Sequence, residues 1–157
     1  MRTSTVARRL AASALLPLTL TGCGLFGGGG QHEYGAQQRA IKVRKGAKFT
    51  LSLPASPALA EHWYLADPWP NGRVLKYRGK REDIHGSPKG VTGGGEGTEY
   101  FDFTARKKGR TTLKLLHCPM ARCSSATEAA ASASPVPTAT GTPDDNAAYF
   151  VYTVTVR

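Results

Sequence analysis

The sequence predicts an all-β domain, either a sandwich or a barrel, on three observations. Short segments with alternating apolar and polar residues recur from residue 39 onward. Gly, Pro and Asn separate these segments at short intervals, and no convincing helical periodicity lies between them. Residues 39–157 are long enough to bury one core, so a single domain of about seven strands is expected.

The first three expected strands cover residues 40–46, 48–54 and 61–67. Alternation places Ile41 and Val43 on one face of the first strand. The second strand stops at Pro54, because proline cannot donate to a ladder, and its inward residues are Phe49, Leu51 and Leu53. Trp63 in the third is expected in the core, since a buried Trp is a common centre of a β-sandwich.

Four further strands are expected at residues 72–78, 98–106, 109–118 and 148–157. Val74, with Leu75 or Tyr77, points inward in the first of them, and Leu113 and Leu115 share a face in the third. The last strand alternates most clearly, with inward Phe150, Tyr152, Val154 and Val156. Trp69, between two prolines, either packs on the sheet or stands as a contact residue.

Residues 124–147 interrupt the pattern. Ala, Ser, Thr and Pro dominate this segment, which has few large apolar residues to bury, so a disordered or weakly ordered insertion is expected. The Ala-rich middle allows a brief helix, which Pro135 and Pro137 limit.

The N-terminus predicts export. Residues 1–22 have the layout of a secretory signal: three arginines, then the short apolar run "LAASALLPLTL". "LTGC", which ends at Cys23, resembles the lipobox of bacterial lipoproteins, and this resemblance implies that Cys23 is lipidated and anchors the protein to the extracytoplasmic face of the cell membrane. The alternative is an ordinary signal peptide with a leftover Cys. Residues 23–38 then form a Gly-rich tether.

The chain is basic. Its formal net charge is +10, and without residues 1–22 it falls to +7. Basic residues gather in residues 73–81 and 106–110. For an exported protein, anionic membrane or wall polymers and acidic proteins are more natural partners than nucleic acid. Solvated charges that favour solubility are an equal alternative.

Cys118 and Cys123 remain once Cys23 is set aside. A disulfide is favoured, because an exported chain leaves the reducing cytoplasm. His117 beside them raises the alternative of a metal site, but a second ligand pair at zinc spacing is absent, so no metal is expected. Redox catalysis would call for a closer Cys-x-x-Cys spacing.

Residues 90–103, "GVTGGGEGTEYFDF", do not suit a phosphate loop. A strand-forming run follows the glycines where a helix N-terminus would be required. Elsewhere the His and carboxylate residues are scattered, and no Ser stands in a nucleophile elbow. We therefore expect neither an enzyme nor a bound cofactor.

The order of these segments resembles the chagasin-like inhibitors of papain-type cysteine proteases. The resemblance rests on "FTLSLPASPALAEHWYL", "GVTGGGEGTEYFDFTARKKGRTTLKLLHCPM" and "AYFVYTVTVR". It implies an immunoglobulin-like β-sandwich with three loops at one end that enter the protease cleft. By this resemblance the protease-binding residues are Pro57, Ala58, Leu59 and Ala60 in the first loop, Gly93, Gly94 and Gly95 in the second, and Pro119 and Met120 in the third.

Several residues of the family's loop motifs are replaced in this sequence. Ala58, Leu59 and Ala60 stand where the family has Thr-Thr-Gly, which removes two hydroxyls and the freedom of a glycine. Cys118 and Met120 replace an Arg and a Trp, the residue types most often found as hot spots. The resemblance implies a reversible cysteine-protease inhibitor. The replaced residues motivate the alternative, a non-inhibitory envelope module that binds anionic wall or membrane components. A small-ligand carrier is a third hypothesis.

Overall fold

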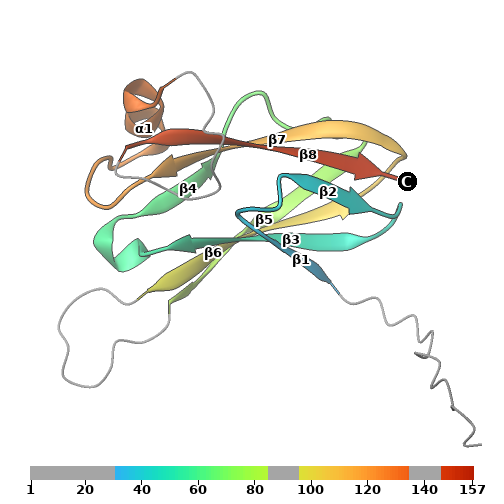
Figure 1. Ribbon diagram of the computed structural model, residues 1–157, viewed down its shortest axis with the longest axis horizontal. Coiled ribbons are helices and arrows are strands. Elements are labelled where there is room, and N and C mark those ends of the chain that lie inside the picture. Colours follow the sequence, from blue (N-terminus) through green and yellow to red (C-terminus); the bar gives the residue numbers. More distant parts are fainter. Residues whose placement is uncertain (1–30, 85–95, 135–145) are drawn as a thin grey trace, which may run out of the picture.

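In the computed structural model, residues 31–84, 96–134 and 146–157 are described, and they form two four-stranded sheets packed face to face (Figure 1). In chain order the elements are β1 (His32–Gly35), β2 (Ala40–Val43), β3 (Lys48–Ala55), the 3-10 helix η1 (Pro57–Leu59), β4 (His62–Leu65), β5 (Leu75–Ile84), β6 (Gly97–Ala105), β7 (Gly109–Cys118), α1 (Ala126–Ser132) and β8 (Ala148–Val156).

One sheet has the strand order β1-β3-β6-β5 and the other β2-β8-β7-β4. The pairs β1–β3 and β2–β8 are parallel, and the other neighbours are antiparallel. The predicted sandwich is confirmed, and the seven predicted strands each correspond to an observed one.

The core lies between the sheets and is built from the inward residues that alternation predicts. Trp63 is fully buried, as expected, and its ring packs edge-on against Phe150 with 4.7 Å between centroids. Phe49 stacks on Phe103 at 5.3 Å. The core described by the structure begins at Ala36 and the described strands lie within residues 32–156, so a chain that starts at Gln31 contains every element that the structure describes.

The first strand lies in the segment predicted as tether. Residues 32–35 pair with β3 in parallel, His32 opposite Phe49, and the Tyr34 ring contacts the Phe49 ring edge-on at 5.7 Å. The sequence does not predict this strand, because "HEYG" is short and polar and forms a strand by pairing with β3.

The length of β5 and the burial of Glu99 also differ from expectation. β5 continues to Ile84, beyond the predicted end at residue 78, because it pairs along its whole length with β6. Gly79, with φ of 145°, supplies the irregularity between Tyr77 and Gly79 that keeps the later residues in register. Glu99, a carboxylate for which the sequence suggests no structural role, is fully buried within β6.

Within the segment 124–147, the structure describes residues 124–134, 146 and 147, and it contains the brief helix α1 in its Ala-rich part. Ser125 caps this helix, since its hydroxyl accepts a hydrogen bond from the Glu128 N–H at 3.2 Å. None of the described helices is long and apolar enough to cross a membrane.

Candidate functional site

Three connections leave the sandwich at the same end, on the left of Figure 1. The first, residues 56–61, follows β3; the second joins Ile84 to Gly97; the third begins at Pro119. The register brings them together, because Gly97 pairs with both Ala55 and Ile84, and the other sheet pairs His62 with Cys118. We call this the loop end.

The first connection folds into η1 and then turns sharply at Ala60. The N–H of Ala60 donates to the Pro57 carbonyl at 3.0 Å, and Ala60 has φ of 58°. This is the left-handed region that glycine prefers. Ala60 is the residue that stands in place of the family's glycine, so the sequence carries a strained residue here.

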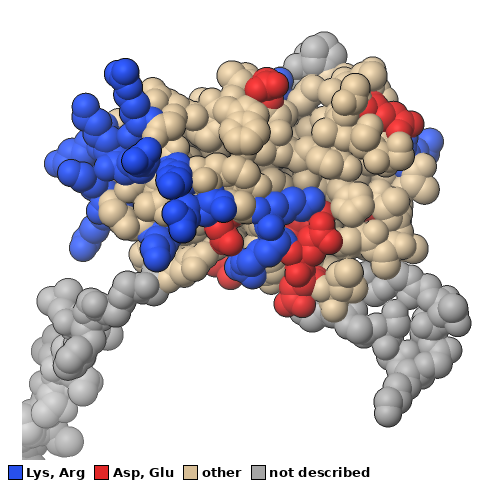
Figure 2. All heavy atoms as spheres, turned by 180° about the vertical axis from the view of Figure 1, so that it is seen from behind, with Lys and Arg blue, Asp and Glu red and all other residues tan. Residues whose placement is uncertain are grey.

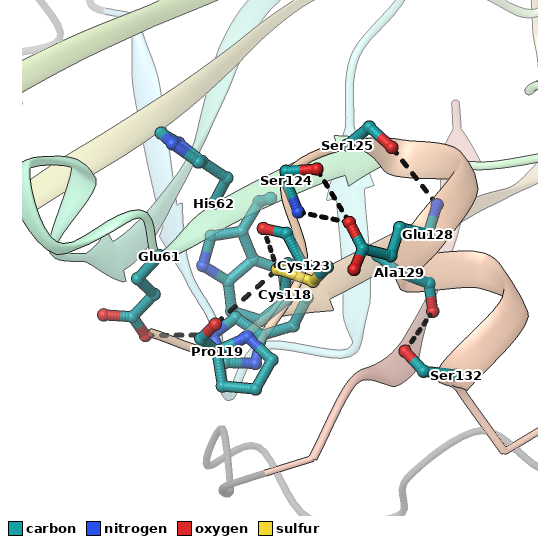
Figure 3. Close-up of a disulfide and its surroundings, with 12 residues drawn as sticks. Glu61, His62, Cys118, Pro119, Cys123, Ser124, Ser125, Glu128, Ala129 and Ser132 are labelled. Carbon is teal, nitrogen blue, oxygen red and sulfur yellow. Dashed lines mark hydrogen bonds and ion pairs between the residues drawn. A yellow bond between two sulfur atoms is a disulfide. The ribbon is translucent and has the colours of Figure 1, made fainter. Parts of the chain in front are cut away.

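The third connection is closed by the predicted disulfide between Cys118 and Cys123, whose Cα atoms are 6.1 Å apart (Figure 3). Both cysteines are buried against Leu116 and Ala129, so the bridge joins the end of β7 to α1. The connection contains a second left-handed alanine, Ala121, with φ of 53°.

A main-chain hydrogen bond links the two connections. The Ala121 N–H donates to the Leu59 carbonyl at 3.2 Å. Beside it, the Glu61 carboxylate lies 2.9 Å from His117 Nε2 and accepts a hydrogen bond from the ring N–H. His117 is buried and packs on Trp63 with 4.5 Å between ring centroids, so the first and third connections are held in a fixed relation.

Exposed large apolar side chains concentrate here. Leu59 is 40% exposed, Ile84 50% and Met120 53%, one from each connection or its flanking strand. Apolar side chains exposed together mark an interaction site more often than single ones do. Leu59 and Met120 were predicted as contact residues; Ile84 was missed, although it is the one apolar residue in the polar run 78–89.

A groove of about 790 Å³ lies at the loop end and is lined by Pro54, Ala55, Ser56, Glu61, Glu96, Gly97 and Thr98. A Cβ on Gly97 would come within 2.8 Å of the Asp83 carbonyl oxygen and 3.2 Å of Pro57 Cδ. Glycine is therefore required where the first connection meets the base of the second. The predicted contact residues Pro57 and Ala58 lie in η1, and Pro119 directly follows β7.

Glu99 supports the loop end from inside. Its Oε2 accepts from the Trp63 N–H at 2.7 Å, and its Oε1 lies 2.9 Å from His62 Nδ1 and 2.7 Å from Lys80 Nζ. Lys80 also donates to the Trp63 carbonyl at 3.0 Å. Glu99 on β6 thus holds β4, the strand that follows the first connection and belongs to the other sheet.

His62, Glu82 and Glu99 lie close enough together for a metal site. The Lys80 ammonium, however, lies 2.7 Å from Glu99 and 3.6 Å from Glu82, so this cluster carries its own cation. A divalent ion would meet a like charge there, and we assign no metal to it.

Four predicted site residues lie outside the described residues: the lipidation site Cys23 and the loop residues Gly93, Gly94 and Gly95. Trp69 is 58% exposed and touches the edge of Tyr77 in the connection between β4 and β5, at the opposite end of the sandwich. It is thus a surface aromatic residue distant from the loop end.

The arrangement is suited to recognition. Among the described residues of this end, the two cysteines are bonded to each other, and Glu61, Lys80 and Glu99 are occupied by ion pairs with neighbours. What the loop end offers to another molecule is apolar side chains and main-chain groups on a supported frame.

Comparison with known proteins agrees with this assignment. Residues 42–119 match the sequence model of a family described as Chagasin family peptidase inhibitor I42, which comprises non-enzymatic inhibitors. No curated protein matches the chain. The match begins within β2, includes β3 to β7 and ends at Pro119, the start of the third connection.

Two solved structures share the fold. A cysteine protease inhibitor of Entamoeba histolytica, EhICP2, is similar with a TM-score of 0.52 and 12% identity, over 80% of this chain and 95% of that one. Amebosin is similar with a TM-score of 0.52 and 15% identity, over 82% and 99% of the respective chains. At these identities the likeness concerns the immunoglobulin-like β-sandwich.

Proposed function

We propose, from the match of residues 42–119 to the chagasin family, that the chain is an exported, lipid-anchored, reversible inhibitor of papain-like cysteine proteases. The observation that carries the proposal is the loop end, where Leu59, Ile84 and Met120 stand exposed around linked connections. Lipid anchoring rests on the "LTGC" sequence at Cys23.

The mechanism is occlusion of the cleft. Leu59 and Met120 enter apolar subsites, and burying such side chains contributes roughly 1.5–3 kcal/mol each. The Ala121–Leu59 hydrogen bond and the Glu61–His117 pair fix the two connections before binding, so little conformational entropy is lost on association. The mechanism forms no covalent bond, so the complex dissociates with protease activity restored.

Titration of residues 31–157 against papain with a fluorogenic peptide substrate tests the proposal. We expect tight inhibition that is reversed on dilution. Leu59→Asp and Met120→Asp each raise the inhibition constant by roughly 30-fold, because a charge replaces an apolar anchor and hot-spot residues contribute about 2 kcal/mol or more.

Trp69→Asp is the matched control, because Trp69 is at least as exposed as Leu59 and Met120 but lies at the opposite end. It should leave the inhibition constant within about twofold, since distant exposed sites act independently. Absence of inhibition at micromolar concentration, or an equal loss in all three variants, would refute loop insertion. Lipid anchoring is tested separately, by loss of the protein from the detergent phase on Cys23→Ser.

A further inference from the structure

We propose that the end of the sandwich opposite the loop end docks on an anionic lipid surface and binds its phosphate headgroups. We call it the basic end and define it by six residues: Arg44, Lys45, Arg106, Lys107, Lys108 and Arg157. In this orientation the loop end is directed away from the membrane. The inference goes beyond inhibition and applies whether or not the loop end binds a protease.

Main-chain hydrogen bonds bring these residues to one place. Lys45 N–H donates to the Arg157 carbonyl at 3.0 Å, and Gly46 N–H donates to the Ala105 carbonyl at 2.8 Å. The turn between β2 and β3, the turn between β6 and β7 and the end of β8 therefore meet. Figure 2 shows Lys and Arg gathered there, at the left of the view.

The charges of this end are available to a ligand. All six side chains are exposed. Among the described residues, the ion pairs of Lys and Arg involve Lys80 and Arg81, and none of them includes a residue of the basic end. Arg73 adds a further charge next to it, since Arg106 N–H donates to the neighbouring Val74 carbonyl at 2.8 Å. An unneutralised set of cations on rigid turns is complementary to a plane of phosphates.

The path of the chain favours a membrane over a soluble polymer. β1 runs parallel to β3, and β3 begins at Lys48 at the basic end, so the chain enters the domain there. Cys23 lies only eight residues before Gln31. Eight residues reach at most about 29 Å when fully extended, so a lipid on Cys23, part of the proposed function, would hold the basic end within reach of the headgroups.

The opposite end is charged unfavourably for such a surface. Glu82 and Asp83 at the end of β5 and Glu96 before β6 are exposed acids at the loop end. Phosphates repel them while they attract the basic end. Charge polarity and chain entry therefore select the same orientation.

Co-sedimentation of residues 31–157 with vesicles tests the docking without a lipid anchor. We expect binding to vesicles of phosphatidylglycerol and phosphatidylcholine, little binding to pure phosphatidylcholine, and a steep loss as salt is raised. The double variant Lys107→Gln and Lys108→Gln should bind roughly 10- to 30-fold more weakly, at about fivefold for each charge near the surface.

The control is the double variant Lys114→Gln and Arg122→Gln, which also removes two positive charges but from residues outside the basic end. It should bind within about threefold of wild type. Equal losses in the two double variants would overturn the proposal, as would equal binding to both kinds of vesicle. Tighter binding to a soluble anionic wall polymer than to anionic vesicles would overturn the choice of a lipid surface. Vesicle binding does not involve the loop end, so inhibition and docking can fail independently.

Discussion

The two ends of the sandwich differ in how their turns are built. At the basic end, the turn between β2 and β3 has Gly46 at φ of 84°. At the loop end, the corresponding left-handed positions are occupied by Ala60 and Ala121. A left-handed alanine costs roughly 1–2 kcal/mol, and a glycine avoids this cost. The loop end is therefore the strained end, as sites of recognition often are.

The ends also differ in how their charges are used. At the loop end, Glu99 and Glu61 are tied to Lys80, His62 and His117 inside the protein. At the basic end the cations face solvent. One end thus uses buried charges to hold a frame in position, while the other leaves its cations exposed to solvent.

The largest effect should come from the internal support of the loop end. Glu99→Ala removes the carboxylate that binds Trp63 N–H, His62 and Lys80, and breaking a buried pair in this way costs about 3–5 kcal/mol. Urea denaturation measures the free energy of unfolding. Glu82→Ala is the control, because it removes a carboxylate from the same lysine, and the exposed pair of Glu82 with Lys80 contributes about 1 kcal/mol or less. Similar losses in both variants would contradict the special role of Glu99.

The middle of the molecule, between the two ends, should respond to alkali. Burial raises the pKa of Tyr152 from 10.0 to about 12. The folded state therefore favours the neutral phenol. The contribution of this preference to the free energy of unfolding is full below pH 10 and is lost as pH rises toward 12. The two pKa units correspond to about 3 kcal/mol.

Tyr152→Phe isolates this effect, because the variant retains the ring and the other tyrosines. In the wild type, the Tyr152 hydroxyl donates to the Ala36 carbonyl at 3.2 Å, so the variant should be less stable than wild type at neutral pH. Above pH 10 the difference in unfolding free energy should shrink and then reverse. A difference that stays constant between pH 8 and 12 would show that Tyr152 does not titrate in this way.

The smallest effects test the contrast between the turns directly. Gly46→Ala should destabilise the fold by about 1 kcal/mol through the backbone alone, since nothing lies within 4 Å of the added Cβ. Ala60→Gly should stabilise it by up to about 1 kcal/mol. Thermal unfolding of the two variants measures both changes. Opposite signs confirm that the strain lies at the loop end; a loss of stability in Ala60→Gly would disprove it.

How much of the site could be predicted depends on whether its signal is local. The disulfide was predicted from two cysteines close together in an exported chain, and Leu59 and Met120 were predicted as contact residues from the family resemblance; in the structure the cysteines are bonded and both side chains are exposed at the loop end. Ile84 and Glu99 were missed, because their roles depend on pairing across strands far apart in sequence. β1 was missed for the same reason.

By itself the sequence determined the all-β class, the inward faces of the strands and the basic character of the chain, because alternation and composition are local properties. Only the tertiary structure decided that Glu99 is buried under Trp63, that the exposed apolar residues share one end, and that the basic turns share the other. Such groupings depend on sheet register and order, which join residues that no local pattern connects.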